Sequence, residues 1–97
     1  MSKYIILFRF TQKGIENIKE SPARVEAAKQ LFRDVNAEVE KFYGLMGRYD
    51  TMFIVEAPND ETIVKAVATL VSLGNVQTET LRAFTDEEYR SIIEALP

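Results

Sequence analysis

The sequence predicts an α+β domain in which a four-stranded antiparallel sheet carries two helices on one face. The chain has 97 residues, of which 46% are hydrophobic and 28% are charged, and this is the size and composition of one globular domain spanning residues 1–97. Apolar runs with strand composition alternate with segments of helical spacing, and neither an internal repeat nor a linker interrupts them. These observations assign all elements to a single core.

The first part of the chain predicts a strand, a loop and a helix. Residues 4–10 are dense in aromatic and β-branched side chains, which favours a strand. Residues 11–14 are interpreted as a loop that ends with a glycine. Ser21 suits the cap of the following helix, and Pro22 suits its first position because proline lacks the N–H that would have no partner there. The apolar face of this helix comprises Val25, Ala28, Leu31, Phe32 and Val35.

The middle of the chain predicts a hairpin and a second helix. Residues 37–46 and residues 52–55 have strand composition and flank a turn that contains Gly47. Residues 58–61 begin a helix with acidic side chains in its first turn, where the helix dipole favours them, and Gly74 ends it. The apolar face of this helix comprises Ile63, Val64, Val67, Leu70 and Val71.

The last elements are a strand over residues 76–84 and a short closing helix. Thr85 and Glu88 have the spacing of a capping box at the start of that helix. The apolar positions that follow are Tyr89, Ile92, Ile93 and Leu96. The complete order is β-α-β-β-α-β-α, and its first six elements match the split βαβ pattern of ferredoxin-like domains.

Both faces of the predicted sheet carry apolar side chains. In the first strand one face carries Tyr4, Ile6 and Phe8, and the other carries Ile5 and Leu7. A sheet with one solvated face would alternate apolar and polar residues, and a large exposed apolar patch is rare on a monomer. Because the closing helix is too short to cover four strands, the pattern predicts a homodimer in which two sheets face each other around a cavity. Whether such dimers assemble further stays open.

The composition excludes several classes of chemistry. The chain has no cysteine, histidine or tryptophan, which excludes disulfides, thiolate nucleophiles, imidazole bases and Cys/His metal sites. We therefore expect no cofactor and no metal. The net charge of −3 provides no positive field for nucleic acid, and the longest apolar run is too short to span a membrane. With no targeting segment recognised, the default location is the cytoplasm.

Three segments resemble the GYD-domain family of small proteins. They are residues 47–50 (Gly-Arg-Tyr-Asp), residues 55–58 (Val-Glu-Ala-Pro) and residues 74–84, of which the run from Thr78 to Phe84 is the most specific. Other matching features are residues 4–7, Thr11 with Gly14, and Lys19 followed by Pro22 and Arg24. The resemblance covers essentially the whole chain. The departures are an arginine between the glycine and the tyrosine, Asn36 where glycine is frequent, and Asn59 where an acidic residue is common.

The resemblance implies a dimeric α+β barrel, in which two ferredoxin-like subunits pack sheet to sheet. This agrees with the homodimer predicted from the two apolar faces. The resemblance implies little about function, because relatives of the barrel include cofactor-free monooxygenases, lactone isomerases, haem-handling enzymes and ligand-sensing domains.

Polar side chains inside the predicted strands are the best candidates for a binding site. The alternation places Arg9 and Glu56 on the face that would meet the second copy, and Thr78, Thr80 and Arg82 of the last strand are expected to join them. Such a set suits a small ligand, and the two arginines suit an anionic one. We favour the alternative, in which the charged members form an ion-pair network that stabilises the dimer. A single bulge in the last strand would reverse the assignment of its faces.

The turn motif Gly47, Tyr49 and Asp50 also has two interpretations. A tyrosine hydroxyl beside a carboxylate suits a proton-transfer pair. Ordinary turn chemistry explains the same residues if Gly47 adopts a positive φ, Asp50 bonds the backbone of the turn and Tyr49 packs on a neighbour. We favour the structural interpretation and assign no catalytic residue.

Three functions are consistent with these patterns. The first is a homodimer that binds a small ligand with little or no enzymatic activity. The second is a cofactor-independent isomerase or oxygenase in which Glu56 or Tyr49 transfers a proton. The third is a structural or regulatory dimer without a ligand.

Overall fold

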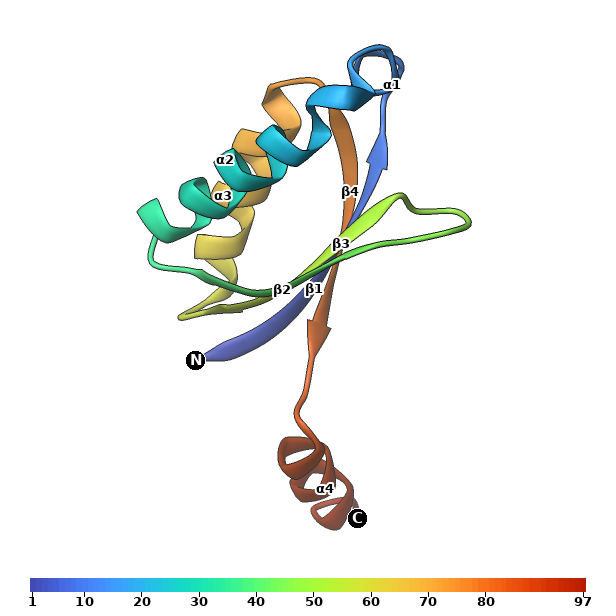
Figure 1. Cartoon of the computed structure of the whole chain (residues 1–97). Coiled ribbons are helices and arrows are strands. Elements are labelled where there is room, and N and C mark those ends of the chain that lie inside the picture. Colours follow the sequence, from blue (N-terminus) through green and yellow to red (C-terminus); the bar gives the residue numbers. More distant parts are fainter.

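The fold is described by a computed structural model that covers residues 1–97. Four antiparallel strands form one sheet in the order β2-β3-β1-β4. The strands are β1 (Ser2–Phe10), β2 (Glu38–Gly44), β3 (Thr51–Ala57) and β4 (Val76–Ala83). The helices are α1 (Gln12–Glu16), the 3₁₀ turn η1 (Ile18–Glu20), α2 (Ser21–Asp34), α3 (Asp60–Ser72) and α4 (Asp86–Glu94). Because α2 and α3 cover the same face of the sheet (Figure 1), the predicted ferredoxin-like arrangement is confirmed.

The core lies between the sheet and the two helices α2 and α3. The alternation predicted for β1 is confirmed, since Tyr4, Ile6 and Phe8 are buried against the helices. Phe53 of β3 is the centre of the core, with its ring 5.1 Å from that of Phe8 in an edge-on contact. The remaining buried residues are Ala28, Phe32, Ala37, Val55, Ala57, Ile63 and Ala66.

The segment between β1 and α2 differs from the prediction. Residues 11–14 were expected to be a loop, but the short helix α1 begins here, and the Thr11 hydroxyl accepts a hydrogen bond from the Gly14 N–H at 3.2 Å. The η1 turn leads directly into α2, so Glu20 rather than Ser21 occupies the N-cap. A five-residue helix has too few positions to show a hydrophobic period, and this is why the sequence pattern missed it.

The second helix and the turns follow the predicted pattern. Asn59 caps α3, because its side-chain oxygen accepts a hydrogen bond from the Thr62 N–H at 2.9 Å. Gly74, after the end of α3, has a φ of 85°. Asn36, between α2 and β2, has a φ of 67°, a left-handed conformation that asparagine tolerates better than most residues.

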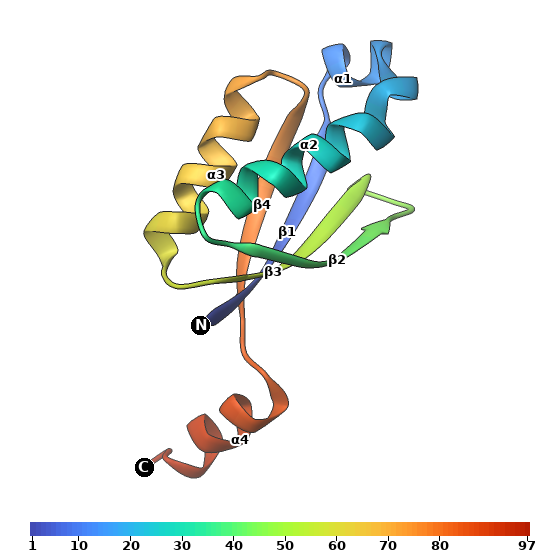
Figure 2. The same ribbon diagram turned by 60° about the vertical axis from the view of Figure 1, so that its left-hand side comes forward.

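Helix α4 stands apart from the other elements. It hangs from the end of β4 in both Figure 1 and Figure 2, away from α2 and α3. The predicted capping box is present: the Glu88 N–H donates to the Thr85 hydroxyl at 3.1 Å, and the Thr85 N–H donates to the Glu88 carboxylate at 2.8 Å. The latter bond lowers the pKa of Glu88. None of the residues of α4 is buried, although Tyr89, Ile92 and Ile93 are apolar.

No helix of the chain combines the length and the apolar character needed to cross a lipid bilayer.

Candidate functional site

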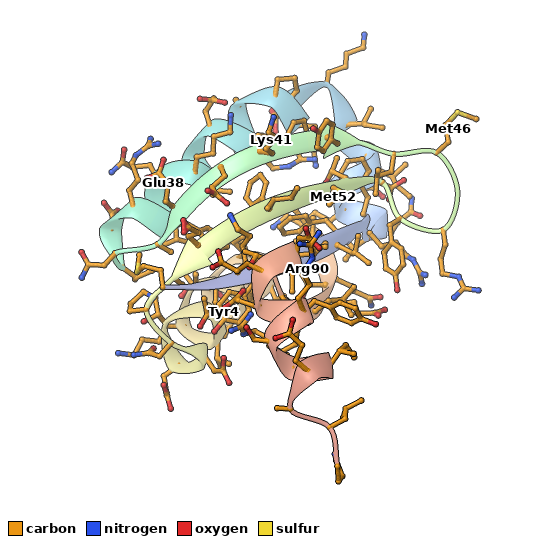
Figure 3. All side chains as sticks on the ribbon, turned by 90° about the horizontal axis from the view of Figure 1, so that it is seen from below. Tyr4, Glu38, Lys41, Met46, Met52 and Arg90 are labelled. Atoms are coloured by element: carbon orange, nitrogen blue, oxygen red, sulfur yellow. The ribbon has the colours of Figure 1, made fainter.

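The face of the sheet turned away from α2 and α3, here called the outer face, is apolar at its centre. In β1 it carries Ile5 and Leu7, which lie between two neighbouring strands. Ile54 and Met52 of β3 stand opposite them, and Leu81 of β4 stands opposite Ile5. All five side chains retain exposure to solvent, and no helix covers them. Figure 3 labels Met52 on its strand within this sheet.

One end of the outer face is rich in carboxylates. Lys3 of β1 pairs in register with Glu56 of β3, which in turn pairs with Glu38 of β2. A β-bulge in β2 sets Glu40 out of register, and the Lys3 ammonium donates to its carboxylate at 2.6 Å. This hydrogen bond to Glu40 raises the pKa of Lys3. Glu56 has no ion-pair partner in the chain.

The other end of the outer face is rich in arginines. The Arg9 Nε donates to the Arg48 backbone carbonyl at 3.1 Å, and its guanidinium lies 5.3 Å from the centre of the Tyr49 ring. The Tyr49 hydroxyl donates in turn to the Glu79 carboxylate of β4. The charge of Arg9 has no carboxylate partner within ion-pair distance.

The expected gathering of five polar residues on one face is wrong for the last strand. Residues that stand opposite each other in an antiparallel pair point to the same face. Thr78, Thr80 and Arg82 pair with the helix-facing residues Phe8, Ile6 and Tyr4. Arg82 therefore lies over the Tyr4 ring and donates to the Lys3 and Ala83 carbonyls, on the opposite side of the sheet from Arg9 and Glu56. The physical reason is the register of β4, which apolar content alone could not fix.

The turn motif joins the β2–β3 connection to the end of β1. Gly47 has a φ of 110°, as its interpretation as a turn glycine predicts. The Asp50 carboxylate accepts a hydrogen bond from the Phe10 N–H at 2.8 Å, so it holds the neighbouring strand rather than its own turn. The Asp50 carbonyl closes the turn by accepting from the Leu45 N–H at 2.9 Å. Met46 projects from the tip of this connection in Figure 3 and is almost fully exposed.

Tyr49 and Asp50 do not form a proton-transfer pair in this geometry. The Tyr49 hydroxyl bonds to Glu79, whereas the Asp50 carboxylate bonds to a backbone N–H. The hydrogen bond to Glu79 raises the pKa of Tyr49, which keeps the hydroxyl protonated at neutral pH. Tyr49 is consequently a poor proton acceptor, and its ring supports Arg9.

Two polar contacts were not anticipated from the sequence. The Tyr4 hydroxyl donates to Asp60 at 2.5 Å, at the start of α3, and burial of the tyrosine raises its pKa further than this bond does. The Lys3–Glu40 pair depends on the β-bulge, which leaves no clear pattern in the sequence. Neither contact contains the nucleophile or metal ligands of a reaction centre, and no cluster of carboxylates suited to a metal ion occurs in the chain.

A cavity of about 280 Å³ lies on the helix side of the sheet, between α2, the end of α3 and the strands. Aromatic and aliphatic side chains dominate its lining, among them Phe8, Phe10, Phe42, Phe53, Val25, Leu31, Leu70 and Val76. Arg24 is its only charged residue, and the guanidinium already donates to the Asn17 and Gly14 carbonyls at 2.8 and 3.2 Å. The cavity therefore offers apolar contact and no free cation.

The family of the chain follows from a comparison with protein-family models. The model of the GYD domain matches residues 4–93. The chain belongs to the GYD-domain family. The match includes the Gly47–Asp50 turn and the whole of β4, so it confirms the resemblance noted from the sequence.

Two proteins of the bacterium Thermus thermophilus are similar to this chain. One, named Glutamine synthetase and cystathionine beta-lyase binding protein, is 36% identical over 84 residues, which are 86% of this chain and 88% of that protein. The other is TTHA0845, whose crystal structure has a TM-score of 0.58 and 26% identity, covering 88% of this chain and 95% of the other. The second comparison agrees with the ferredoxin-like fold.

Proposed function

We propose that this GYD-domain protein is a homodimeric binding partner of enzymes that act on amino acids, and that it works by protein contact rather than by catalysis. The observation that carries the proposal is the pair of apolar surfaces for which the protomer has no cover, namely the outer face and α4. The name of the relative, which describes binding to glutamine synthetase and cystathionine β-lyase, suggests the class of partner.

The outer face is assigned to the second copy of the chain. Its apolar centre formed by Ile5, Leu7, Met52, Ile54 and Leu81 is the surface that the predicted sheet-to-sheet homodimer would bury. Contiguous apolar surface of this kind marks protein interfaces more often than free protein surface.

Helix α4 is assigned to the enzyme partner. A nine-residue helix is marginal by itself in water, even with a capping box, and an amphipathic helix is stabilised when its apolar face enters a groove. Ile92 and Ile93 lie on that face with 44% and 45% exposure. A dimer would carry two such helices, and a multisubunit enzyme would bind both with increased avidity.

The test uses glutamine synthetase and cystathionine β-lyase from the same organism, each immobilised as a purified protein. Ile92→Glu is expected to weaken binding of the GYD protein to either enzyme at least about tenfold, because it places a charge in the apolar contact. Ser91→Glu is the matched control, since it adds the same charge to the opposite side of α4. Equal binding by wild type and both variants, or no binding by wild type to either enzyme, would refute the proposal.

A second candidate function, small-ligand binding, is favoured by the cavity beneath α2. Because Arg24 is already bonded to two carbonyls and the other lining groups are neutral, the chemistry suits a neutral aromatic or aliphatic molecule rather than an anion. The arrangement differs from the anionic ligand expected at Arg9, Glu56, Thr78, Thr80 and Arg82, since these residues occupy two faces.

Indole is a convenient probe of the cavity, because the chain contains no tryptophan to obscure its fluorescence. Indole emission is expected to shift to shorter wavelength with wild type and to stay at its aqueous position with Ala28→Leu, whose larger side chain fills the cavity. Ala68→Leu, at an exposed position of α3, is the control and is expected to behave as wild type. An unshifted emission with wild type, or a shift that survives Ala28→Leu, would exclude this candidate.

A further inference from the structure

The charges on the outer face are distributed unequally between its two ends. At one end stand Lys3, Glu38, Glu40 and Glu56, of which only Lys3 and Glu40 form an ion pair. At the other end Arg9 lies against the turn that carries Arg48. The β1 residues that mark the two ends, Lys3 and Arg9, are six positions apart, about 20 Å along a strand. An excess of negative charge therefore faces an excess of positive charge across the apolar centre of the same surface.

Two-fold symmetry turns this distribution into a choice between two dimers. When two copies pack outer face to outer face, the symmetry axis lies between the sheets and parallel to them. An axis along the strands brings each end onto the same end of the second copy, so Arg9 would meet Arg9 and Glu56 would meet Glu56. An axis across the strands exchanges the ends, so Arg9 would meet Glu56. Like charges at an interface are costly, whereas opposite charges favour association and fix its orientation.

We propose that the second copy binds the outer face end to end, with its strands running opposite to those of the first, so that Arg9 of each protomer pairs with Glu56 of the other. This inference rests on the homodimer proposed above and adds its orientation and its two specifying ion pairs. The two-fold axis then passes near the level of Ile6, halfway between Lys3 and Arg9, and the apolar side chains of Ile5, Leu7 and Ile54 surround it.

The geometry of the protomer leaves both partners free for this role. Neither Arg9 nor Glu56 has an ion pair within its own chain. The Tyr49 ring and the Arg48 carbonyl hold the Arg9 guanidinium, leaving its remaining N–H groups to donate to a carboxylate. Sheets stack at about 10 Å, a separation that an extended arginine and a glutamate from opposing faces can span together. Lys3 stands beside Glu56 in the register and is already bonded to Glu40.

The test is a charge exchange measured by sedimentation-equilibrium ultracentrifugation at low salt. Arg9→Glu places two carboxylates at each contact, and Glu56→Arg places two arginines there. Each single variant is expected to raise the dimer dissociation constant at least about 100-fold. The double variant Arg9→Glu with Glu56→Arg reverses both partners and is expected to return the constant to within about tenfold of wild type. Far-UV circular dichroism confirms that each variant is folded.

Met52→Glu separates the failure of this inference from the failure of the dimer itself. It places a charge in the apolar centre and is expected to dissociate the dimer in either orientation. If Met52→Glu dissociates the dimer while the single charge variants do not, or while the double variant is not restored, the end-to-end orientation is wrong. If wild type is a monomer, or if Met52→Glu stays dimeric, the outer face is not the interface and both proposals fall.

Discussion

Replacing Phe53 with alanine is expected to lower the free energy of unfolding by about 3–5 kcal/mol. The Phe53 side chain is 1% exposed, and its ring makes edge-on contacts with three others, those of Phe8, Phe32 and Phe42 at 5.1, 5.6 and 5.9 Å. The alanine variant loses the burial of the ring and also enlarges the cavity that Phe53 already lines, so the surrounding side chains have little means of closing the gap.

Urea unfolding at a fixed protein concentration measures this change. The midpoint is expected to fall with little change in the slope, because the variant exposes a similar surface on unfolding. Met46→Ala is the control, since Met46 is 99% exposed and its truncation removes no packed side chain. A loss below about 1 kcal/mol for Phe53→Ala would mean that the core is not centred on this ring.

Gly14→Ala is expected to destabilise the protein by about 1–3 kcal/mol, although alanine is normally the better residue within a helix. A Cβ atom at position 14 would lie 2.2 Å from the backbone oxygen of Asn75. That oxygen accepts a hydrogen bond from the Thr11 N–H at 3.0 Å, and the Thr11 hydroxyl donates to the Gly74 carbonyl at 2.5 Å. Relief of the clash therefore requires α1 to move away from the start of β4, which strains or breaks both bonds.

Gly44→Ala provides the matched control for this substitution. No atom outside the immediate chain neighbours lies within 4 Å of a Cβ built at Gly44, and its φ is not in the left-handed region. We expect this variant to be neutral or stabilised by up to about 1 kcal/mol, because alanine restricts the unfolded chain. Thermal unfolding of the two variants side by side measures the contrast. Similar behaviour of the two variants would show that α1 does not approach β4 as closely as described.

Most of the fold could be predicted because its signals are local. The cap at Asn59, the capping box at Thr85 and the apolar spacing of α2 each involve residues close together in the chain, and each appears where the pattern placed it. Helix α1 was missed, since its capping residue Thr11 is followed by only five helical positions. The sequence showed that α4 is a helix but not that it would lie apart from the sheet, because its apolar residues also suit packing on a core.

The candidate site was harder to predict because it depends on register. Placing Arg9 and Glu56 on the outer face required only the alternation within two buried strands, whose helix-facing residues are clearly apolar. The exposed edge strand β4 has no such contrast, so its polar residues Thr80 and Arg82 were assigned to the wrong face. The bulge at Glu40 and its ion pair with Lys3 arise from strand pairing, which single-strand patterns do not encode.

The position of β1 between β3 and β4 has a consequence for the protein during its synthesis. β1 is made first, yet one of its two neighbours is the last strand to be made, so Leu7 waits for Glu79 before that edge is paired. A nascent chain on the ribosome therefore exposes an unpaired edge of β1 until nearly the whole sequence has emerged. The residues of α4 follow β4 and help to carry that strand clear of the ribosome. Late completion of the sheet should make this chain depend on chaperones or on rapid closure by β4 while it is being translated.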